Sequence, residues 1–226
     1  MKAIILAAWK WTRLRPITIE IPKPLIKINW KTILEYNLEN IYKDVNEIII
    51  VIKYLWDKIK NHLWNDYKWT KITYHSQCEK KWTWGAISDI NIDEDILLLN
   101  WDSIFYKEDI DNLLREKNYW CLVKEVEQPG KYWIFKNKDW YAIEIVEKPK
   151  ENIWNLANLW VYKFNKSIID ISQNIPLSAR DEYEITDSIN KFIEKNKFKL
   201  ITIKNKFIDI WYPEDIEKAE QILNNI

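Results

Sequence analysis

Glycine is almost absent from this chain. Its 226 residues include only Gly85 and Gly130, whereas an average usage of about 7% would give about 16 glycines. Tight turns often need positive φ, which glycine adopts without strain, so a chain this poor in glycine has few residues suited to them. The chain also contains 15 tryptophans, and the two residue types together come close to the number expected of glycine alone.

Several other features are missing. No apolar run approaches the roughly 18 residues of a membrane span, and the N-terminus lacks a signal-peptide pattern. Cys78 and Cys121 are the two cysteines and make no disulfide framework, so we expect a cytoplasmic protein. The 34 basic and 34 acidic residues cancel, which removes the general electrostatic case for nucleic acid or membrane as partners. The oligomeric state, including a homo-oligomer, stays open.

The tryptophans stand beside residues typical of turns. Trp101 lies in Asn-Trp-Asp, Trp140 in Asp-Trp-Tyr and Trp30 in Asn-Trp-Lys. Asn-Gly and Asp-Gly are turn sequences, whereas Asn-Trp and Asp-Trp are not. We interpret the tryptophans as standing where the functional product has glycine, as when UGA codons of a glycine-reading lineage are translated as tryptophan. The alternative is a truly tryptophan-rich chain, such as a glycan-binding module with stacking surfaces.

The first half of the chain alternates apolar runs with helical periodicity. We expect strands at 2–7, 47–52, 71–75, 96–99 and 119–126. We expect helices at 31–42, 56–63, 84–90 and 107–116, and a long loop at 8–30. This order predicts an α/β sheet, mostly parallel, with helices on both faces and ligands beyond the carboxyl ends of the strands. The loop after Ala7 and the carboxylate Asp102 both fall at those ends.

The second half is mixed. We expect a hairpin at 132–135 and 141–147, strands at 156–164 and 198–203, and helices at 182–194 and 213–223. No linker, repeat or low-complexity segment interrupts the chain. We therefore expect one domain over residues 1–226.

The segment after the first strand is the most informative. It reads L-A-A-W-K-W-T-R-L-R-P at 6–16, followed by P-K-P-L at 22–25. With glycine at 9 and 11, this is a strand leading into a glycine-rich turn whose N–H groups can surround a phosphate. Arg13 and Lys23 add positive charge. The segment is neither a P-loop nor a dinucleotide fingerprint, because its glycine spacing differs and position 14 is leucine.

Together these motifs resemble the sugar-1-phosphate nucleotidylyltransferases, the NDP-sugar pyrophosphorylases. The resemblance continues almost to the end of the chain, through K-W-T-W-G-A-I at 81–87, L-L-L-N-W-D at 97–102, V-E-K-P at 146–149, N-L-A-N-L-W-V-Y at 155–162, R-D-E-Y-E-I-T-D at 180–187 and F-I-D-I-W-Y-P-E-D at 207–215. The family pattern has glycine at 9, 11, 82, 101, 160 and 211, where this chain has tryptophan.

The resemblance implies a three-layer, Rossmann-like nucleotidyltransferase fold with a mixed, mainly parallel central sheet. It also implies transfer of a nucleotidyl group from an NTP to a sugar 1-phosphate, with Mg²⁺ as cofactor. Its catalytic residues would be Arg13, Lys23 and Asp102, and its metal ligands Asp102 and Asp209. The nucleotide-binding residues would be Ala7, Ala8, Trp9, Lys10, Trp11, Thr12, Gln77, Trp82 and Thr83. The sugar-phosphate residues would be Glu147, Lys148, Asn158 and Arg180.

Two positions depart from the family pattern, and several functions stay open. Asp181 replaces a usual glycine beside Arg180, and Tyr212 replaces a common threonine. We expect UTP or dTTP as the donor, because the Gln77 amide can pair with a pyrimidine imide. The run T-W-G-A at 83–86, read as T-G-G-A, instead favours a guanylyltransferase for mannose or heptose 1-phosphate, and a cytidylyltransferase is a further alternative. A non-catalytic nucleotide-sugar-binding paralogue is another rival. We expect no C-terminal β-helix and no acyltransferase activity.

Overall fold

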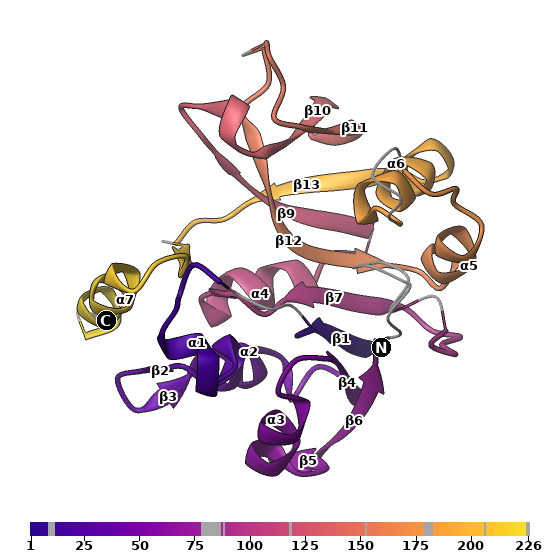
Figure 1. Cartoon of the computed structure of the whole chain (residues 1–226). Helices are drawn as coiled ribbons and strands as arrows, with labels where there is room; N and C mark the ends of the chain where they lie inside the picture. Colours follow the sequence, from indigo (N-terminus) through magenta and orange to yellow (C-terminus); the bar gives the residue numbers. More distant parts are fainter. Residues whose placement is uncertain are drawn as a thin grey trace.

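The computed structural model describes residues 1–8, 12–77, 87, 89–117, 119–151, 153–178, 183–205 and 207–224. Within them one large sheet runs through the molecule in the order β10-β11-β13-β9-β12-β7-β1-β4-β6-β5 (Figure 1). Its strands are β1 (Lys2–Leu6), β4 (Glu47–Ile52), β5 (Asp66–Tyr67), β6 (Thr70–Ser76), β7 (Ile96–Asn100), β9 (Tyr119–Glu125), β10 (Trp133–Lys138), β11 (Tyr141–Glu147), β12 (Leu156–Phe164) and β13 (Phe198–Thr202).

The sheet is mixed, as expected of this α/β fold. Strand β1 pairs in parallel with both β4 and β7, and β4 pairs in parallel with β6. Strand β12 runs antiparallel to β7 and β9, so β9 points the same way as β7. The carboxyl ends of β1, β4, β7 and β9 therefore meet at one edge, where ligands of such sheets bind.

Helices cover both faces of the sheet and make the fold three-layered. They are α1 (Ile17–Glu20), α2 (Ile33–Ile41), α3 (Trp56–Leu63), α4 (Lys107–Leu114), α5 (Ser167–Gln173), α6 (Ile185–Lys195) and α7 (Glu214–Asn224). Side chains alternate along β1, so Ala3 and Ile5 face one layer while Ile4 and Leu6 face the other. The first layer holds α2, α3 and α4, and the second holds α5 and α6.

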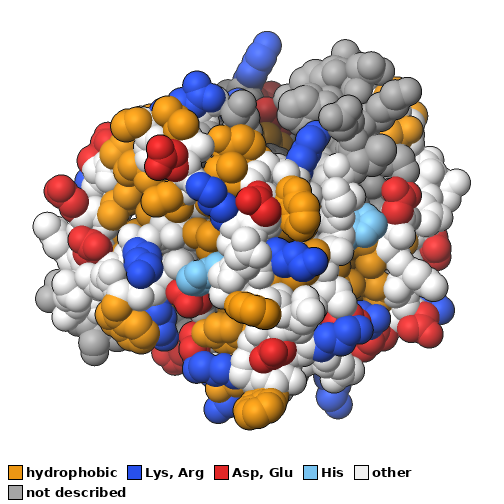
Figure 2. Space-filling model, turned by 60° about the horizontal axis from the view of Figure 1, so that its bottom comes forward, with side chains coloured by type: hydrophobic (Ala, Val, Ile, Leu, Met, Phe, Trp, Pro, Cys, Tyr) orange, Lys and Arg blue, Asp and Glu red, His pale blue; other side chains and the backbone are white. Residues whose placement is uncertain are grey.

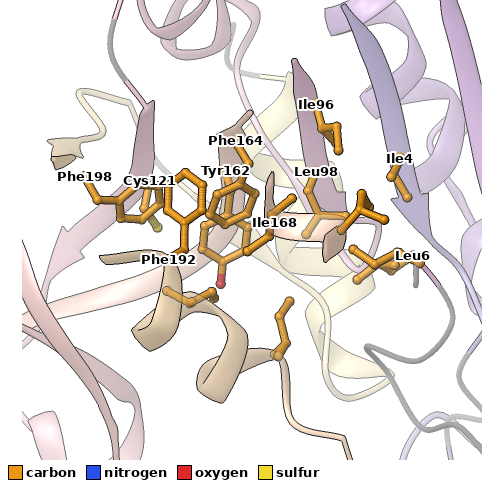
Figure 3. Packing of buried hydrophobic residues seen from close by; sticks show 14 of the residues in the cluster. Ile4, Leu6, Ile96, Leu98, Cys121, Tyr162, Phe164, Ile168, Phe192 and Phe198 are labelled. Carbon is orange, nitrogen blue, oxygen red and sulfur yellow. The ribbon is translucent and has the colours of Figure 1, made fainter. Parts of the chain in front are cut away.

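The layer under α5 and α6 has an aromatic core (Figure 3). The rings of Phe164 on β12 and Phe198 on β13 are stacked, with centroids 5.3 Å apart. Phe192 from α6 meets both rings edge-on, at 4.9 and 5.7 Å. Edge-to-face and stacked contacts of this kind add to the free energy of burial. The aromatic cluster thus fixes α6 on the sheet.

Two small sheets flank the large one. Strands β2 (Lys27–Ile28) and β3 (Lys31–Thr32) form one, and β8 (Ser103–Ile104) and β14 (Ile208–Asp209) form the other. A third apolar cluster joins them to α7: it includes Ile28 from β2, Ile104 from β8 and Ile208 from β14. In Figure 1 the C-terminal helix α7 consequently lies beside the N-terminal hairpin, where the Asn29 N–H donates to Glu220.

The expected strands and most expected helices are confirmed close to their expected bounds, but the region 8–30 differs from the expected loop. It contains α1, a 3-10 turn at Lys23–Leu25 and β2. Elements this short show no periodicity, and the three prolines of the segment obscure them. Helix α5 was also not expected. Of the expected helix at 84–90, residues 87, 89 and 90 are described and are not helical, and the rest lies outside the described residues.

Several tryptophans occupy backbone conformations that suit glycine. Trp64, Trp69, Trp140 and Trp160 have φ of 58°, 76°, 65° and 60°. A side chain in this left-handed region costs roughly 1–2 kcal/mol, whereas glycine adopts it freely. The turn-like placement does not hold throughout, because Trp120 lies fully buried inside strand β9. The replacement of glycine by tryptophan in this chain therefore stays a hypothesis.

Candidate active site

The small sheet of β8 and β14 brings two distant carboxylates together. Asp102 immediately precedes β8, and Asp209 ends β14 opposite Ser103. The Ser103 hydroxyl lies 3.5 Å from Asp102 Oδ1 and 3.4 Å from Asp209 Oδ1. Both aspartates assigned to the metal by resemblance therefore meet at the carboxyl end of β7.

Burial and neighbouring charges shape the titration of the two carboxyl groups. Burial raises the pKa of Asp209, and the neighbouring charge of Asp102 raises it further, to about 6. Burial also raises the pKa of Asp102, against the opposing effect of Lys23. Two carboxylates held close in a low-dielectric site favour a bound cation or a proton. The pair is thus suited to a divalent cation that also takes phosphate oxygens and water, the usual ligand set of Mg²⁺.

Lys23 places a buried ammonium group beside this pair. Its side chain is fully buried, and Nζ lies 3.8 Å from Asp102 Oδ2. The surrounding prolines and the 3-10 turn at Lys23–Leu25 set its direction. Burial lowers its pKa, while the carboxylates Asp102, Asp209 and Asp215 oppose that shift. A fixed cation next to a carboxylate pair is an arrangement that can hold a polyphosphate.

Two tryptophan rings cover the cations of this site. Lys23 Nζ lies 5.3 Å from the Trp101 ring centroid and 6.0 Å from that of Trp211. The Arg13 guanidinium, on an exposed side chain, lies 5.1 Å from the Trp211 ring. Cation–π contacts of this length are attractive. The indoles therefore occupy space that faces both cations and would compete with an anion there.

Lys124 lies close enough to Asp209 to feel its charge, and the sequence analysis did not single it out. It lies near the carboxyl end of β9, with its ammonium 4.8 Å from the Phe207 ring centroid and 5.6 Å from that of Tyr132. Burial lowers its pKa, and the charge of Asp209 opposes the shift. The sequence does contain a signal for Lys124, because this lysine directly follows the apolar run W-C-L-V at 120–123 and ligands bind beyond the ends of such strands.

The end of β11 carries the pair expected at the sugar phosphate. Lys148 Nζ lies 3.5 Å from Glu147 Oε1, and the lysine side chain is half exposed. The Lys148 backbone N–H donates to the Tyr132 carbonyl, and the lysine adopts a φ of 43°. The structure thus holds both side chains at the end of β11, and their sugar-phosphate role stays a prediction.

Asn158 is less accessible than a sugar contact would suggest. Its amide is buried in β12 and donates to the Tyr162 hydroxyl at 2.6 Å. Its Oδ1 accepts from the Trp160 N–H at 3.0 Å and from the Cys121 thiol at 3.3 Å. These bonds stabilise the irregular pairing between β12 and β9. The described bonds therefore support a structural role, and the sugar contact stays untested.

The described part of the expected nucleotide site lies at the ends of β1 and β6. Ala7 and Ala8 are buried, and the Ala7 N–H donates to the Val51 carbonyl at 2.8 Å. Gln77 follows β6, is buried, and donates its backbone N–H to the Ile52 carbonyl. Thr12 is exposed. The predicted site residues Trp9, Lys10, Trp11, Trp82, Thr83 and Arg180 lie outside the described residues.

Other possible sites have little support in the described ranges. No group of three or more His, Cys, Asp and Glu side chains there could hold a metal by itself. None of the helices in those ranges has both the length and the apolar character needed to cross a bilayer. On the face shown in Figure 2, basic and acidic side chains are interspersed and neither sign forms a continuous field. That pattern differs from the basic stripe of a nucleic-acid-binding surface.

Fold and site together define an α/β nucleotidyltransferase. The family model described as nucleotidyl transferase matches residues 2–225, and the chain belongs to this family. It is 35% identical to the bifunctional protein GlmU of Methanocaldococcus jannaschii, over 99% of this chain and 54% of that protein. It thus spans about half the length of that relative. It is 32% identical to the UTP–glucose-1-phosphate uridylyltransferase AglF of Haloferax volcanii, over 99% of this chain and 96% of AglF.

A solved structure shows the same fold. UDP-glucose pyrophosphorylase complexed with UDP-glucose superposes with a TM-score of 0.86, covering 99% of this chain and 98% of that one. The sequence identity is 19%, so this likeness concerns the fold alone. The expected Rossmann-like nucleotidyltransferase architecture is confirmed.

Proposed function

We propose that this protein transfers a nucleotidyl group from UTP or dTTP to a sugar 1-phosphate. A phosphate oxygen of the sugar phosphate attacks the α-phosphorus of the nucleotide. The bond from that phosphorus to the α–β bridging oxygen breaks, and pyrophosphate leaves with its electron pair. The attacking oxygen is already ionised, so the reaction needs alignment and charge neutralisation rather than a protein nucleophile.

The observation that carries the proposal is the grouping of Asp102, Asp209 and Lys23. The two carboxylates are held by β8 and β14, and the lysine ammonium lies 3.8 Å from Asp102. When bound, Mg²⁺ would neutralise charge on the reacting phosphates, with Asp102 and Asp209 as its protein ligands. Lys23 and Arg13 would orient phosphate oxygens, and Glu147 and Lys148 would bind the sugar phosphate. AglF, whose name specifies UTP and glucose 1-phosphate, supports the pyrimidine donor.

A pyrophosphate-release screen tests the proposal. Four NTPs are each combined with several sugar 1-phosphates, including glucose 1-phosphate, with and without Mg²⁺. The enzyme is the chain with glycine at 9, 11, 82 and 101, compared with the literal tryptophan chain. Release with UTP or dTTP that is lost in Asp102→Asn supports the proposal. Release with GTP or CTP alone would make this a guanylyl- or cytidylyltransferase.

Two further hypotheses can be tested: a non-catalytic function, and glycine at the tryptophan positions. A protein that binds nucleotide sugar without releasing pyrophosphate in any combination would be the non-catalytic paralogue. Peptide mass spectrometry of the native protein tests the glycine hypothesis directly, because intact tryptophan at positions 9 and 11 would contradict it. The cytoplasmic location is part of the proposal, since the cysteine content suits a reducing compartment.

A further inference from the structure

A buried amide on α2 contacts the segment that carries Asp102. Asn37 is 1% exposed, and its Nδ2 lies 3.0 Å from the Ser103 carbonyl and 3.4 Å from the Trp101 carbonyl. These carbonyls belong to the residues on either side of Asp102. The Asn37 amide, which has two N–H groups, thus contacts the backbone on both sides of Asp102.

A polar residue such as Asn37 is unexpected on the buried face of α2, where packing alone would favour an apolar side chain. The helix buries Ile33, Leu34, Leu38 and Ile41 at helical spacing, and Asn37 lies on the same buried face. Its Oδ1 is buried and has no hydrogen-bond partner among the residues that the structure describes. A buried acceptor without a partner is unfavourable, and an apolar side chain of similar size would avoid it. Local rules broken in this way are expected at functional sites.

Helix α2 is itself well anchored, so the amide has a fixed origin. Thr32 caps the helix, accepting from the Glu35 N–H at 3.1 Å, while Glu35 accepts from the Thr32 N–H at 2.7 Å. Such a reciprocal cap satisfies donors at the first turn and fixes the start of the helix. Asn37 follows one turn later and therefore presents its amide to Trp101 and Ser103 from a rigid element.

We propose that Asn37 is a positioning residue that holds Asp102 in register with Asp209 for the transfer reaction. The Ser103 carbonyl that it binds belongs to the residue opposite Asp209 in the β8–β14 pair. The amide thereby fixes the strand on which the two carboxylates meet. The catalytic consequence rests on the proposed function, whereas the anchoring of the segment 101–103 can be measured independently.

The test compares two amides of the same helix face. Asn37→Leu removes the contacts on both sides of Asp102 and fills a similar volume. Asn40→Leu is the matched control, because the Asn40 amide, also buried, donates to the carbonyl of Phe105 at 2.7 Å, beyond β8. Both variants are made in the chain with glycine at 9, 11, 82 and 101. They are measured by thermal unfolding, peptide-level hydrogen exchange and steady-state kinetics. Asn37→Ala, which cannot clash, replaces Asn37→Leu if that variant does not fold.

We expect Asn37→Leu to unfold at the temperature of its parent or above it. Exchange in the peptide containing 101–103 should become faster, and kcat should fall by roughly tenfold to a hundredfold, with KM for the nucleotide changed less than about threefold. The Mg²⁺ concentration for half-maximal rate should rise. Asn40→Leu should keep kcat within about threefold of the parent.

Parental exchange at 101–103 in Asn37→Leu would overturn the inference, whatever happens to the rate. Faster exchange with an unchanged kcat would overturn the catalytic role of the anchoring. If the parent releases no pyrophosphate with any substrate pair, the proposed function fails. In that case hydrogen exchange at 101–103 still tests whether Asn37 positions Asp102. Calorimetry of Mn²⁺ binding to parent and variant provides the second measurement.

Discussion

The carboxylates of Asp102 and Asp209 both lie within hydrogen-bond distance of one hydroxyl, that of Ser103. A hydroxyl has one hydrogen, so it can serve only one of the two carboxylates at a time. Burial raises the pKa of both carboxyl groups, and the charge of Asp102 raises that of Asp209 further. Two buried carboxylates beside one ammonium group, that of Lys23, favour a bound cation or proton, and this property leads to the first three predictions.

Replacing either aspartate by asparagine should reduce turnover strongly while leaving the fold intact. We expect Asp102→Asn and Asp209→Asn each to lower kcat by at least about 10²–10³-fold, because each removes a preorganised charge. If both bind one Mg²⁺, the double variant should lose far less than the product of the single losses. Steady-state kinetics at saturating Mg²⁺ measures this. Two independent, multiplying losses would contradict a shared ion.

The raised pKa of Asp209, about 6, predicts a pH-dependent stability. The unfolded carboxyl has a pKa near 3.9, so between about pH 4 and 6 the folded state binds more protons, and stability falls as pH rises through this window. Asp209→Asn should therefore be more stable than the parent at pH 7, by about 2–3 kcal/mol, and equal to it below about pH 4. Urea unfolding with a chelator present measures the difference.

Activity should show the opposite trend to stability in the same window. Protonated Asp209 cannot bind a cation, so kcat should fall as pH drops below about 6. Raising the Mg²⁺ concentration should move this acid limb to lower pH, because the cation competes with the proton. A limb that does not move with Mg²⁺ would assign the titration to another group.

Removing the tryptophans around the phosphate site should create nucleotide binding. We expect glycine at 9, 11, 82 and 101 to give measurable affinity for UTP with Mg²⁺ that the literal chain lacks. Glycine at 211 should raise it further, since the Trp211 ring covers both Arg13 and Lys23.

Calorimetric titration of each form measures this gain. The control is a chain with glycine at the exposed turn positions Trp64 and Trp140, which lie in other loops. Equal affinity in the literal and restored chains would refute the steric argument.

Trp69→Gly should stabilise the protein. Trp69 has a φ of 76° and is 98% exposed, so its removal relieves backbone strain and sacrifices no buried contact. We expect a gain of about 0.5–1 kcal/mol after the larger unfolded-state entropy of glycine is counted. The matched control is Trp56→Gly, at the first residue of α3 and 48% exposed, which should destabilise the helix. Denaturant midpoints compare the two.

Gln77 should influence the choice of base. Its amide can both accept from the imide N–H of uracil or thymine and donate to a ring carbonyl, whereas guanine presents two adjacent donors that suit a carboxylate. The ratio of kcat/KM for UTP over GTP should fall in Gln77→Glu, by about 1–3 kcal/mol of discrimination. Gln221→Glu, an exposed position on α7, adds the same charge as a control. A parent that prefers GTP would remove Gln77 from this role.

The local pattern of the chain was sufficient for much of the fold. The apolar runs of β1, β4 and β7 and the helical spacing of α2 could be read directly, because side-chain periodicity follows from backbone geometry. The alternation of these elements predicted the α/β class and placed Asp102 at a strand end. The excess of tryptophan over glycine was visible in the composition and in the turn-like neighbours of several tryptophans, and in the structure four tryptophans have positive φ.

Tertiary structure alone decided how the site is assembled. Strands β8 and β14 each have two residues, too short for any periodic signal, yet their pairing brings Asp209 opposite the neighbour of Asp102. In the sequence Asn37 is one polar residue of an amphipathic helix. Only the structure shows that its amide contacts the carbonyls of Trp101 and Ser103. Periodicity reports which face of an element is buried, but contacts between distant segments depend on the packing of the whole chain.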